Sequence, residues 1–339
     1  MPSILPRPQW FRQRLKKHAE SSYVINVEPY LRVFSQEWFA VTDDNILLPD
    51  SFVSTLDGRN SVYMGPYRKN GHQEMLLPEA QFVLEKPIYV LGGTNNYAHW
   101  VMDVLPRLQA WKANEELGKL PILTDEQKAG FYKEWLELLG VTSTQIIGLP
   151  YPSSAICMQA VYSSVRTDQR FGLPIRNKEQ LQWLRAQLPL KNGPKARLLY
   201  ITRGLNAPER RRIQNEDEVM DLVRKHGFEI HDTDGMNVKD QLEMFNEAKV
   251  ILTVHGAALA NTVAAQPGTC IIELVNDEHH RKYDDKTWFA HSSVLLGHNY
   301  IRVVGKAGDA NTAGDDRPVN KVATYELEHI EKAIRESGR

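Results

Sequence analysis

The feature that most constrains what this chain can fold into is an alternation of strand-like and helix-like segments in its second half. Short apolar runs predict strands over residues 197–202, 228–231, 250–254 and 269–275. Segments with helical spacing of apolar residues lie between them, over residues 216–226 and 238–249, with a short helix from residue 256. Strands and helices that alternate at such short spacing form a parallel sheet with right-handed crossovers. The second half therefore predicts an α/β fold.

The first half is less regular and predicts a β-rich lead-in followed by α/β structure. Pro, Asp-Asn and Asp-Gly turn signals separate short extended segments. These segments are residues 23–27, 31–34, 38–41, 61–63 and 82–84. A strand over residues 87–91 ends at Gly92-Gly93, and a helix is expected to begin after Asn95 or Asn96. Pro106 is expected to kink or end that helix.

Capping and breaking residues set the remaining boundaries. Thr124-Asp-Glu-Gln127 has the pattern of a capping box and predicts a helix start, and Asn215 and Asn237 are expected to cap the helices that follow them. A helix over residues 177–188 runs into Pro189 and a segment that breaks both helix and strand. We therefore expect domains over residues 1–190 and 191–320. A C-terminal helix within 321–339 could pack back on the N-terminal domain.

Composition excludes several classes of protein. The 339 residues suffice for about two domains, each with its own core. Lys and Arg number 41 against 42 Asp and Glu, and this balance argues against a nucleic-acid partner. Cys157 and Cys270 are too few for a disulfide framework or a cysteine zinc site, which favours a reducing compartment.

The first residues carry a basic segment but no secretory signal, because no apolar region follows the basic residues. Five cations precede the first acid, Glu20, and are interleaved with Trp10 and Phe11: Arg7, Arg12, Arg14, Lys16 and Lys17. One interpretation is peripheral contact with a membrane surface. The other is a solvated lead-in that packs a few apolar residues on the body of the protein. No run of about 18 apolar residues predicts a membrane-spanning helix.

Charged and small residues follow the predicted strands of the second half, where ligands of open parallel sheets bind. Arg203 follows the first strand and Arg211 precedes the next helix; His255-Gly256-Ala257-Ala258 follows a later strand, and Glu273 lies near the end of the last. Guanidinium groups and helix N-termini suit phosphate oxygens, and a carboxylate suits ribose hydroxyls. Each signal alone also fits a solvated surface or a structural histidine. Their convergence favours a nucleotide diphosphate site.

Common nucleotide and metal motifs are missing from the sequence. There is no P-loop pattern, and Gly92-Gly93 lacks the third glycine of a dinucleotide fingerprint. Glu278-His279-His280 and His291 are too loosely spaced to predict a metal site.

A second polar constellation lies on the helix expected after Asn96. His99, Asp103 and Arg107 are four residues apart and share one helix face. The stripe is either a surface ladder of ion pairs or a polar face toward an interdomain cleft. In the second case a carboxylate or imidazole could remove a proton from an attacking hydroxyl.

Four sequence blocks carry a family resemblance: Arg203 with Arg211-Arg-Ile-Gln-Asn215, His255-Gly-Ala-Ala-Leu-Ala-Asn261, Ile271-Ile-Glu273-Leu, and Asn96-Tyr-Ala-His99 with Asp103. Together these blocks resemble glycosyltransferase family 61, which includes plant xylosyl- and arabinosyltransferases, animal protein O-GlcNAc transferases and bacterial capsule-type enzymes. The resemblance implies a GT-B arrangement, with two Rossmann-like domains facing each other across a cleft. It also implies inverting transfer without a required metal or cofactor.

The resemblance also implies residue roles. Arg203 and Arg211 would bind the donor diphosphate, and Glu273 would bind the ribose. The segment from His255 to Asn261 would lie at the same phosphates, through His255, Gly256, Ala257, Ala258 and Asn261. The family often has a second glycine where this chain has Ala258, which would make the backbone approach tighter.

We therefore expect a glycosyltransferase that moves a sugar from a nucleoside diphosphate, UDP in particular, to a hydroxyl of a glycan or lipid-linked glycan in cell-surface polysaccharide synthesis. Asp103 is expected to be the base, with His99 as second choice or orienting partner. Asn96 and Arg107 are expected on the acceptor side, Arg107 in a structural role. We expect a cytoplasmic protein, peripheral at the inner face of the membrane if its basic segment binds lipid. The alternatives are a non-catalytic nucleotide- or glycan-binding paralogue and a Rossmann-type oxidoreductase.

Overall fold

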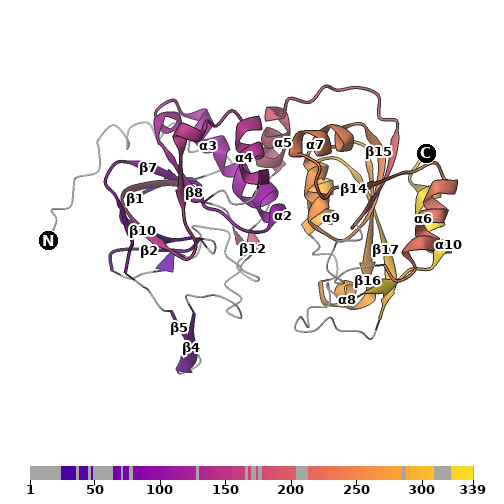
Figure 1. Cartoon of the computed structure of the whole chain (residues 1–339), viewed down its shortest axis with the longest axis horizontal. Coiled ribbons are helices and arrows are strands. Elements are labelled where there is room, and N and C mark those ends of the chain that lie inside the picture. Colours follow the sequence, from indigo (N-terminus) through magenta and orange to yellow (C-terminus); the bar gives the residue numbers. More distant parts are fainter. Residues whose placement is uncertain are drawn as a thin grey trace. The chain divides into compact units, whose positions relative to one another are not determined.

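The chain is described by a computed structural model that forms two compact units, Met1–Leu184 and Arg185–Arg339 (Figure 1). The division lies a few residues before the boundary expected at residue 190. The structure describes residues 24–35, 38–44, 47–48, 64–69, 72–75, 79–126, 130–164, 167–168, 173–174, 178–203, 213–283, 288–308 and 322–338. The basic N-terminal segment and the strand expected at 61–63 lie outside these residues.

The second unit contains a six-stranded sheet in the order β14-β13-β15-β16-β17-β18. Its strands are β13 (Arg197–Thr202), β14 (Glu229–Asp232), β15 (Ala248–Val254), β16 (Cys270–Asn276), β17 (Asn299–Ala307) and β18 (Ala323–Thr324). All neighbours from β14 to β17 are parallel, and β18 pairs antiparallel with β17. The parallel sheet predicted from the alternation is confirmed, and β17 and β18 extend it beyond the prediction.

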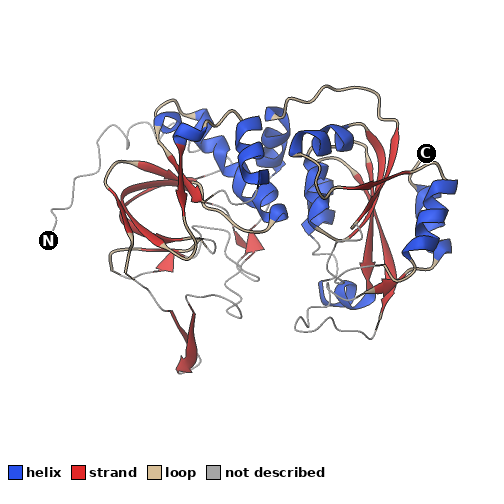
Figure 2. Ribbon diagram, viewed as in Figure 1, coloured by secondary structure: helices blue, strands red, loops and turns tan. Residues whose placement is uncertain are grey.

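Helices cover both faces of this sheet, as Figure 2 shows. On one face lie α6 (Glu216–Lys225) and α10 (Leu327–Glu336), and on the other lie α7 (Val238–Asn246) and α9 (Trp288–Leu295). The 3₁₀ helix η6 (Ala257–Val263) follows β15, and α8 (Asp277–Tyr283) follows β16. Burial of apolar residues on both faces explains why the strands read as continuous apolar runs.

The C-terminal helix α10 belongs to the second unit. Its Ile330 and Ile334 are fully buried in one apolar cluster with Val219 and Val223 of α6 and Tyr200 of β13. The expectation that this helix could also pack back on the N-terminal domain stays a prediction. Its apolar stripe is already covered by the nearest sheet face.

Two local expectations in the second unit are wrong. The helix expected over residues 238–249 ends at Asn246, because Ala248 already pairs with Arg197 in the sheet. Asn215 does not cap α6 through its side chain. Its amide group instead donates to the carbonyl oxygen of Tyr325 at 2.9 Å and accepts from the Tyr325 N–H at 3.1 Å. Asn237, by contrast, is confirmed as an N-cap, since its oxygen accepts from the Asp240 N–H.

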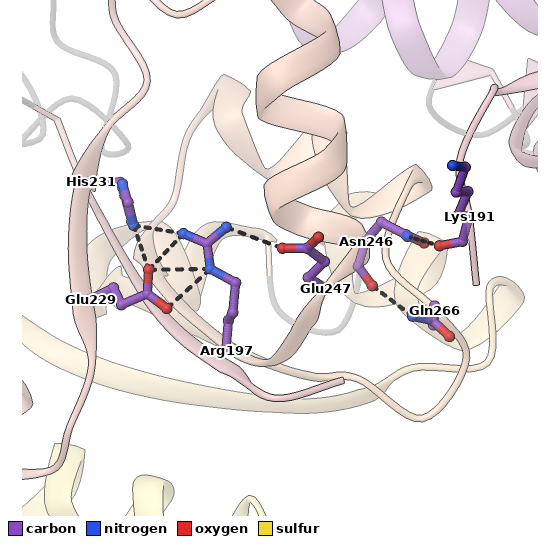
Figure 3. Close-up of polar contacts among 7 residues, drawn as sticks. All are labelled: Lys191, Arg197, Glu229, His231, Asn246, Glu247 and Gln266. Carbon is purple, nitrogen blue, oxygen red and sulfur yellow. Dashed lines mark hydrogen bonds and ion pairs between the residues drawn. The ribbon is translucent and has the colours of Figure 1, made fainter. Parts of the chain in front are cut away.

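Polar contacts tie together the amino-terminal edge of the sheet (Figure 3). Arg197, at the start of β13, forms an ion pair with Glu229 at 2.6 Å and contacts Glu247 at 3.4 Å. Asn246 donates to the Lys191 carbonyl oxygen, which attaches the segment before β13 to the end of α7. These contacts stabilise the amino-terminal edge, whereas ligands of open parallel sheets bind at the opposite, carboxyl-terminal edge.

The first unit is built on a second mixed sheet, in the order β3-β2-β1-β10-β7-β8-β9, with β6 also on β10. Its strands are β1 (Val24–Phe34), β2 (Ala40–Val41), β3 (Leu47–Leu48), β6 (Phe82–Leu84), β7 (Ile88–Val90), β8 (Ile122–Asp125), β9 (Ile146–Leu149) and β10 (Ser154–Ser164). β6 to β10 pair in parallel, whereas β1, β2 and β3 pair antiparallel. Two small hairpins complete the strands: β4 (Met64–Lys69) with β5 (His72–Met75), and β11 (Thr167–Asp168) with β12 (Leu173–Pro174). The β-rich lead-in followed by parallel structure agrees with the sequence.

The helical run after β7 is irregular. It passes from α2 (Tyr97–His99) through a π-helical turn, η2 (Trp100–Val104), and a 3₁₀ turn, η3 (Leu105–Arg107), into α3 (Leu108–Ala113). The break expected at Pro106 is confirmed, because proline cannot donate the helical hydrogen bond. The other helical segments are η4 (Leu117–Lys119), α4 (Gly130–Leu138), η5 (Ser143–Gln145) and α5 (Lys178–Gln187).

The capping box expected at Thr124 is wrong. Thr124 lies in β8, and its hydroxyl donates to the carbonyl oxygen of Gly92 at 2.7 Å. Ile122 and Leu123 beside it are fully buried, so core packing places this segment in the sheet. No described helix is long and apolar enough to cross a membrane.

Candidate active site

The order of the second sheet points to a binding edge between β13 and β15. In a sheet of this order the connections leave these two strands in opposite directions, and ligands bind beyond the carboxyl ends at that point. Arg203 follows the last residue of β13, and His255 follows the last residue of β15. Two residues predicted to contact phosphate therefore flank the switch point.

Arg203 reaches across this edge to the turn after β15. Its Nη1 donates to the carbonyl oxygen of His255 at 3.3 Å. A Cβ added at Gly256 would lie 3.1 Å from the same Nη1, while the φ of Gly256, 177°, is ordinary extended backbone. Space rather than torsion therefore favours glycine here, because a Cβ would displace the Arg203 guanidinium slightly. Burial lowers the pKa of Arg203 and Asp234 opposes that shift; a guanidinium remains charged at neutral pH.

His255 is held by a buried carboxylate. Its Nδ1 lies 2.5 Å from Oε1 of Glu273, and the hydroxyl of Tyr300 donates to Oε2. Glu273 is 0% exposed, whereas the His255 side chain is 18% exposed. Burial raises the pKa of Glu273, but His255, Tyr300 and Arg302 outweigh burial and leave this pKa below its usual value. Among the residues that the structure describes, no hydrogen bond to Nε2 of His255 occurs.

This geometry bears on the ribose role expected for Glu273. Both carboxylate oxygens already accept hydrogen bonds inside the protein, so the observed contacts favour a role in orienting His255. Tyr300 and Arg302 were not predicted from the sequence as residues of this site. In the register of β16 with β17, Arg302 is the partner of Glu273. A strand assigned over residues 299–304 would have placed both side chains on the face of Glu273.

The remaining residues predicted on the donor side have different surroundings. Ala257 and Ala258 are half-buried at the start of η6, beyond the carboxyl end of β15. Asn261 is fully buried, and its amide donates to Oε1 of Gln241 in α7 at 2.8 Å. That bond fixes η6 against α7. Arg211 lies outside the described residues.

The second constellation lies in the first unit, beyond the carboxyl end of β7. His99 Nδ1 lies 2.8 Å from Oδ2 of Asp103, so the pair predicted four residues apart is in contact. The Asp103 side chain is 2% exposed and that of His99 is 14% exposed. Asp103 stands in the π-helical turn, a local widening of a helix that is frequent at functional sites.

Asn96 and Arg107 support this helix. The Asn96 oxygen accepts from the backbone N–H groups of Ala98 and His99 and caps α2. Arg107 is 1% exposed, and its Nη1 donates to the carbonyl oxygen of Leu91 at 3.1 Å. Burial lowers the pKa of Arg107 to about 10, against the opposing charges of Tyr89 and Asp103. The structural role expected for Arg107 agrees with these contacts.

No group of three or more His, Cys, Asp or Glu side chains suited to a metal ion occurs in the described part of the chain. What the described site offers is cationic and hydrogen-bonding side chains at the edge of one sheet. A separate His–carboxylate pair lies after β7 in the first unit.

Comparisons with known proteins agree with this chemistry. The family model Glycosyltransferase 61 matches residues 97–272, more than half of the chain. A segment of 80 residues is 32% identical to β-1,2-xylosyltransferase RCN11 of Oryza sativa subsp. japonica, and it covers 21% of this chain and 15% of that protein. The match thus spans a small part of the length of this relative.

Among solved structures, the chain is similar to two of TibC. One is the bacterial iron-containing dodecameric glycosyltransferase TibC of enterotoxigenic E. coli H10407, with 10% identity, a TM-score of 0.35, and 79% of this chain and 82% of that chain covered. The other is the iron-containing heptosyltransferase TibC in complex with ADP-D-β-D-heptose, with 9% identity, a TM-score of 0.35, and 92% and 96% covered. These likenesses are weak, and the family rests on the sequence match. The chain belongs to the Glycosyltransferase 61 family.

Proposed function

We propose that the protein is an inverting, metal-independent glycosyltransferase of GT-B type that takes its sugar from a nucleoside diphosphate, UDP in the first instance. The observation that carries this proposal is the contact between Arg203 and the His255 turn at the switch point of the second sheet. Two groups able to donate to phosphate lie there beside a small-residue turn. Such groups stabilise the charge that grows on a departing diphosphate.

The reaction has a simple balance. Asp103 removes the proton of an acceptor hydroxyl, and that oxygen forms a bond to the anomeric carbon from the face opposite the leaving group. The bond from the anomeric carbon to the diphosphate oxygen breaks, and the nucleoside diphosphate leaves with its charge next to Arg203, Arg211 and His255. His99 orients the Asp103 carboxylate through the hydrogen bond between them.

The acceptor belongs to the same proposal. A glycan or lipid-linked glycan of a cell-surface polysaccharide such as a capsule would present the hydroxyl, and Asn96 and Arg107 would shape the acceptor side. The enzyme would act in the cytoplasm, with peripheral contact at the inner face of the membrane through the basic N-terminal segment.

A panel of nucleotides tests which nucleoside diphosphate the protein binds. Thermal shift with UDP, ADP, GDP and NAD should show stabilisation by one diphosphate, because a ligand that binds only the folded state raises the melting temperature. Mass spectrometry of reactions with a panel of nucleotide sugars should then identify a transferred sugar. Binding without transfer to any acceptor would instead support the non-catalytic paralogue.

Arg211 has its own test within this proposal. The Arg211→Ala variant should bind UDP about tenfold more weakly in calorimetry, because one charged phosphate contact is lost. An unchanged dissociation constant would remove Arg211 from the donor site.

A further inference from the structure

The contact between His255 and Glu273 determines which ring nitrogen carries a proton. Glu273 is fully buried, and the Tyr300 hydroxyl donates to its second oxygen. The Nε of Arg302 contacts that hydroxyl oxygen at 3.3 Å, which places positive charge behind the carboxylate. These contacts stabilise the ionised form of Glu273. An ionised carboxylate can only accept, so Nδ1 of His255 must be the donor.

This assignment limits what the other nitrogen can do. A neutral imidazole has one N–H, and Glu273 holds it at Nδ1. The Nε2 atom of a neutral His255 then presents a lone pair, which repels a phosphate oxygen. Only the imidazolium offers an N–H at Nε2 as well. The His255 side chain is 18% exposed, whereas that of Glu273 is fully buried.

The other groups around His255 do not replace this proton. His279 of α8 has its ring centroid 4.6 Å from that of His255, and Phe289 of α9 has its centroid at 5.3 Å. Arg203, at the end of β13, bonds to the backbone oxygen of His255. Of the described groups that face the ring, Glu273 from β16 is the acidic one, and Tyr300 and Arg302 of β17 act through it.

We propose that the donor diphosphate is bound by protonated His255, so that diphosphate binding takes up one proton from solvent, with Glu273 as the positioning residue. This inference rests on the proposed function, since it places the diphosphate at the edge formed by Arg203 and His255. It explains why a carboxylate is buried directly behind a phosphate-binding histidine. The ion pair with Glu273 stabilises the imidazolium that the phosphate requires.

Calorimetry of UDP binding in two buffers of different ionisation enthalpy measures the proton uptake directly. In the wild-type protein UDP binding should take up a proton at about pH 8 and take up less as the pH falls, because the free protein then carries more of the imidazolium that the diphosphate requires. Where the uptake reaches one proton, the affinity for UDP should fall by about tenfold for each further pH unit. UDP binding without proton uptake at pH 8 would overturn the inference and leave the proposed function intact.

Two variants locate the proton. In Glu273→Gln the amide can donate to Nδ1, so neutral His255 would carry its proton at Nε2 and uptake should disappear. In His255→Gln a side-chain amide replaces the titrating group, so binding should weaken about tenfold and show no uptake. If Glu273→Gln fails to fold, the result for His255→Gln alone decides whether His255 is the group that takes up the proton.

His279→Gln is the matched control, because it removes a neighbouring histidine and keeps both members of the His255–Glu273 pair. Its proton uptake should equal that of the wild type. Uptake that persists in His255→Gln, or is lost in His279→Gln, would overturn the assignment. If UDP, ADP and GDP all fail to bind the wild-type protein, the proposed function falls and the inference falls with it.

Discussion

Oδ2 of Asp103 lies 2.8 Å from Nδ1 of His99; His99 ends α2, which Asn96 caps, and Asp103 stands in the π-helical turn that follows. The carboxylate is almost completely buried, and its partner is half-buried. A carboxylate oriented by an imidazole in this way is suited to take a proton from a hydroxyl group.

The variant Asp103→Asn should therefore lose almost all sugar transfer while it still binds the donor nucleotide. An amide cannot accept the proton, and general-base catalysis contributes about 10²–10⁴-fold to rate. Turnover should fall by that factor, whereas the UDP dissociation constant in calorimetry should stay within about twofold, a small change on the energy scale of binding. Unchanged turnover would exclude Asp103 as the base and leave His99 as the candidate.

Gly256→Ala should weaken donor binding without unfolding the protein. The added Cβ would lie 3.1 Å from Nη1 of Arg203, so the guanidinium must move away from the turn. Crowding of this kind costs about 1 kcal/mol or more, which corresponds to about tenfold in affinity for UDP. Gly193→Ala is the control, because no atom lies within 4 Å of its added Cβ. Equal affinities in the two variants would contradict the contact.

Gly93→Ala should destabilise the first unit. The new Cβ would lie 2.1 Å from Oδ2 of Asp125 and 2.5 Å from Nε1 of Trp38, and these two side chains already share a hydrogen bond of 2.7 Å. Both are buried, so they cannot swing into solvent. We expect the free energy of unfolding in urea to fall by about 1–3 kcal/mol, with Gly193→Ala unchanged. A fully stable Gly93→Ala protein would show that the Asp125–Trp38 pair can relax.

Acid should destabilise the second unit through His298. Burial lowers the pKa of His298 from its ordinary 6.5 to about 4, although the bond to the Ala265 carbonyl oxygen opposes this shift. The folded protein therefore keeps His298 neutral while the unfolded chain takes up a proton. The contribution of neutral His298 to the free energy of unfolding is fully present above pH 6.5. It falls by about 3 kcal/mol in all as the pH decreases from 6.5 toward 4.

The variant His298→Gln isolates this effect. It keeps a donor for the Ala265 carbonyl but cannot titrate, so its unfolding free energy should fall less than that of the wild type between pH 7 and pH 4.5. Parallel losses in the two proteins would assign the acid sensitivity to other groups.

Much of the second unit could be predicted from the sequence because its strands are buried on both faces. The predicted strand at 197–202 coincides with β13, and those at 250–254 and 269–275 agree with β15 and β16 within a few residues. Continuous apolar runs bounded by capping residues are local signals, and they need no knowledge of partners. The residues after β13 and β15 could be assigned to one edge for the same reason.

Other segments depended on partners that are distant in the chain. Thr124 has a local capping pattern, but burial of Ile122 and Leu123 between β7 and β9 places it in a strand. Asn215 stands at a helix start, yet its side chain bonds to Tyr325. In both cases a tertiary contact outweighed a local preference worth about 1 kcal/mol.

The local order of residues predicted a parallel α/β domain, one sheet edge that carries Arg203 and His255, and a His99–Asp103 pair one helical turn apart. Tertiary structure alone decided what surrounds these groups. Glu273 could be read as a ribose ligand until β17 brought Tyr300 and Arg302 beside it in the sheet and buried the carboxylate behind His255. The reason is physical: periodicity along a chain predicts which face a side chain takes, whereas its burial and hydrogen-bond partners depend on which strand becomes its neighbour.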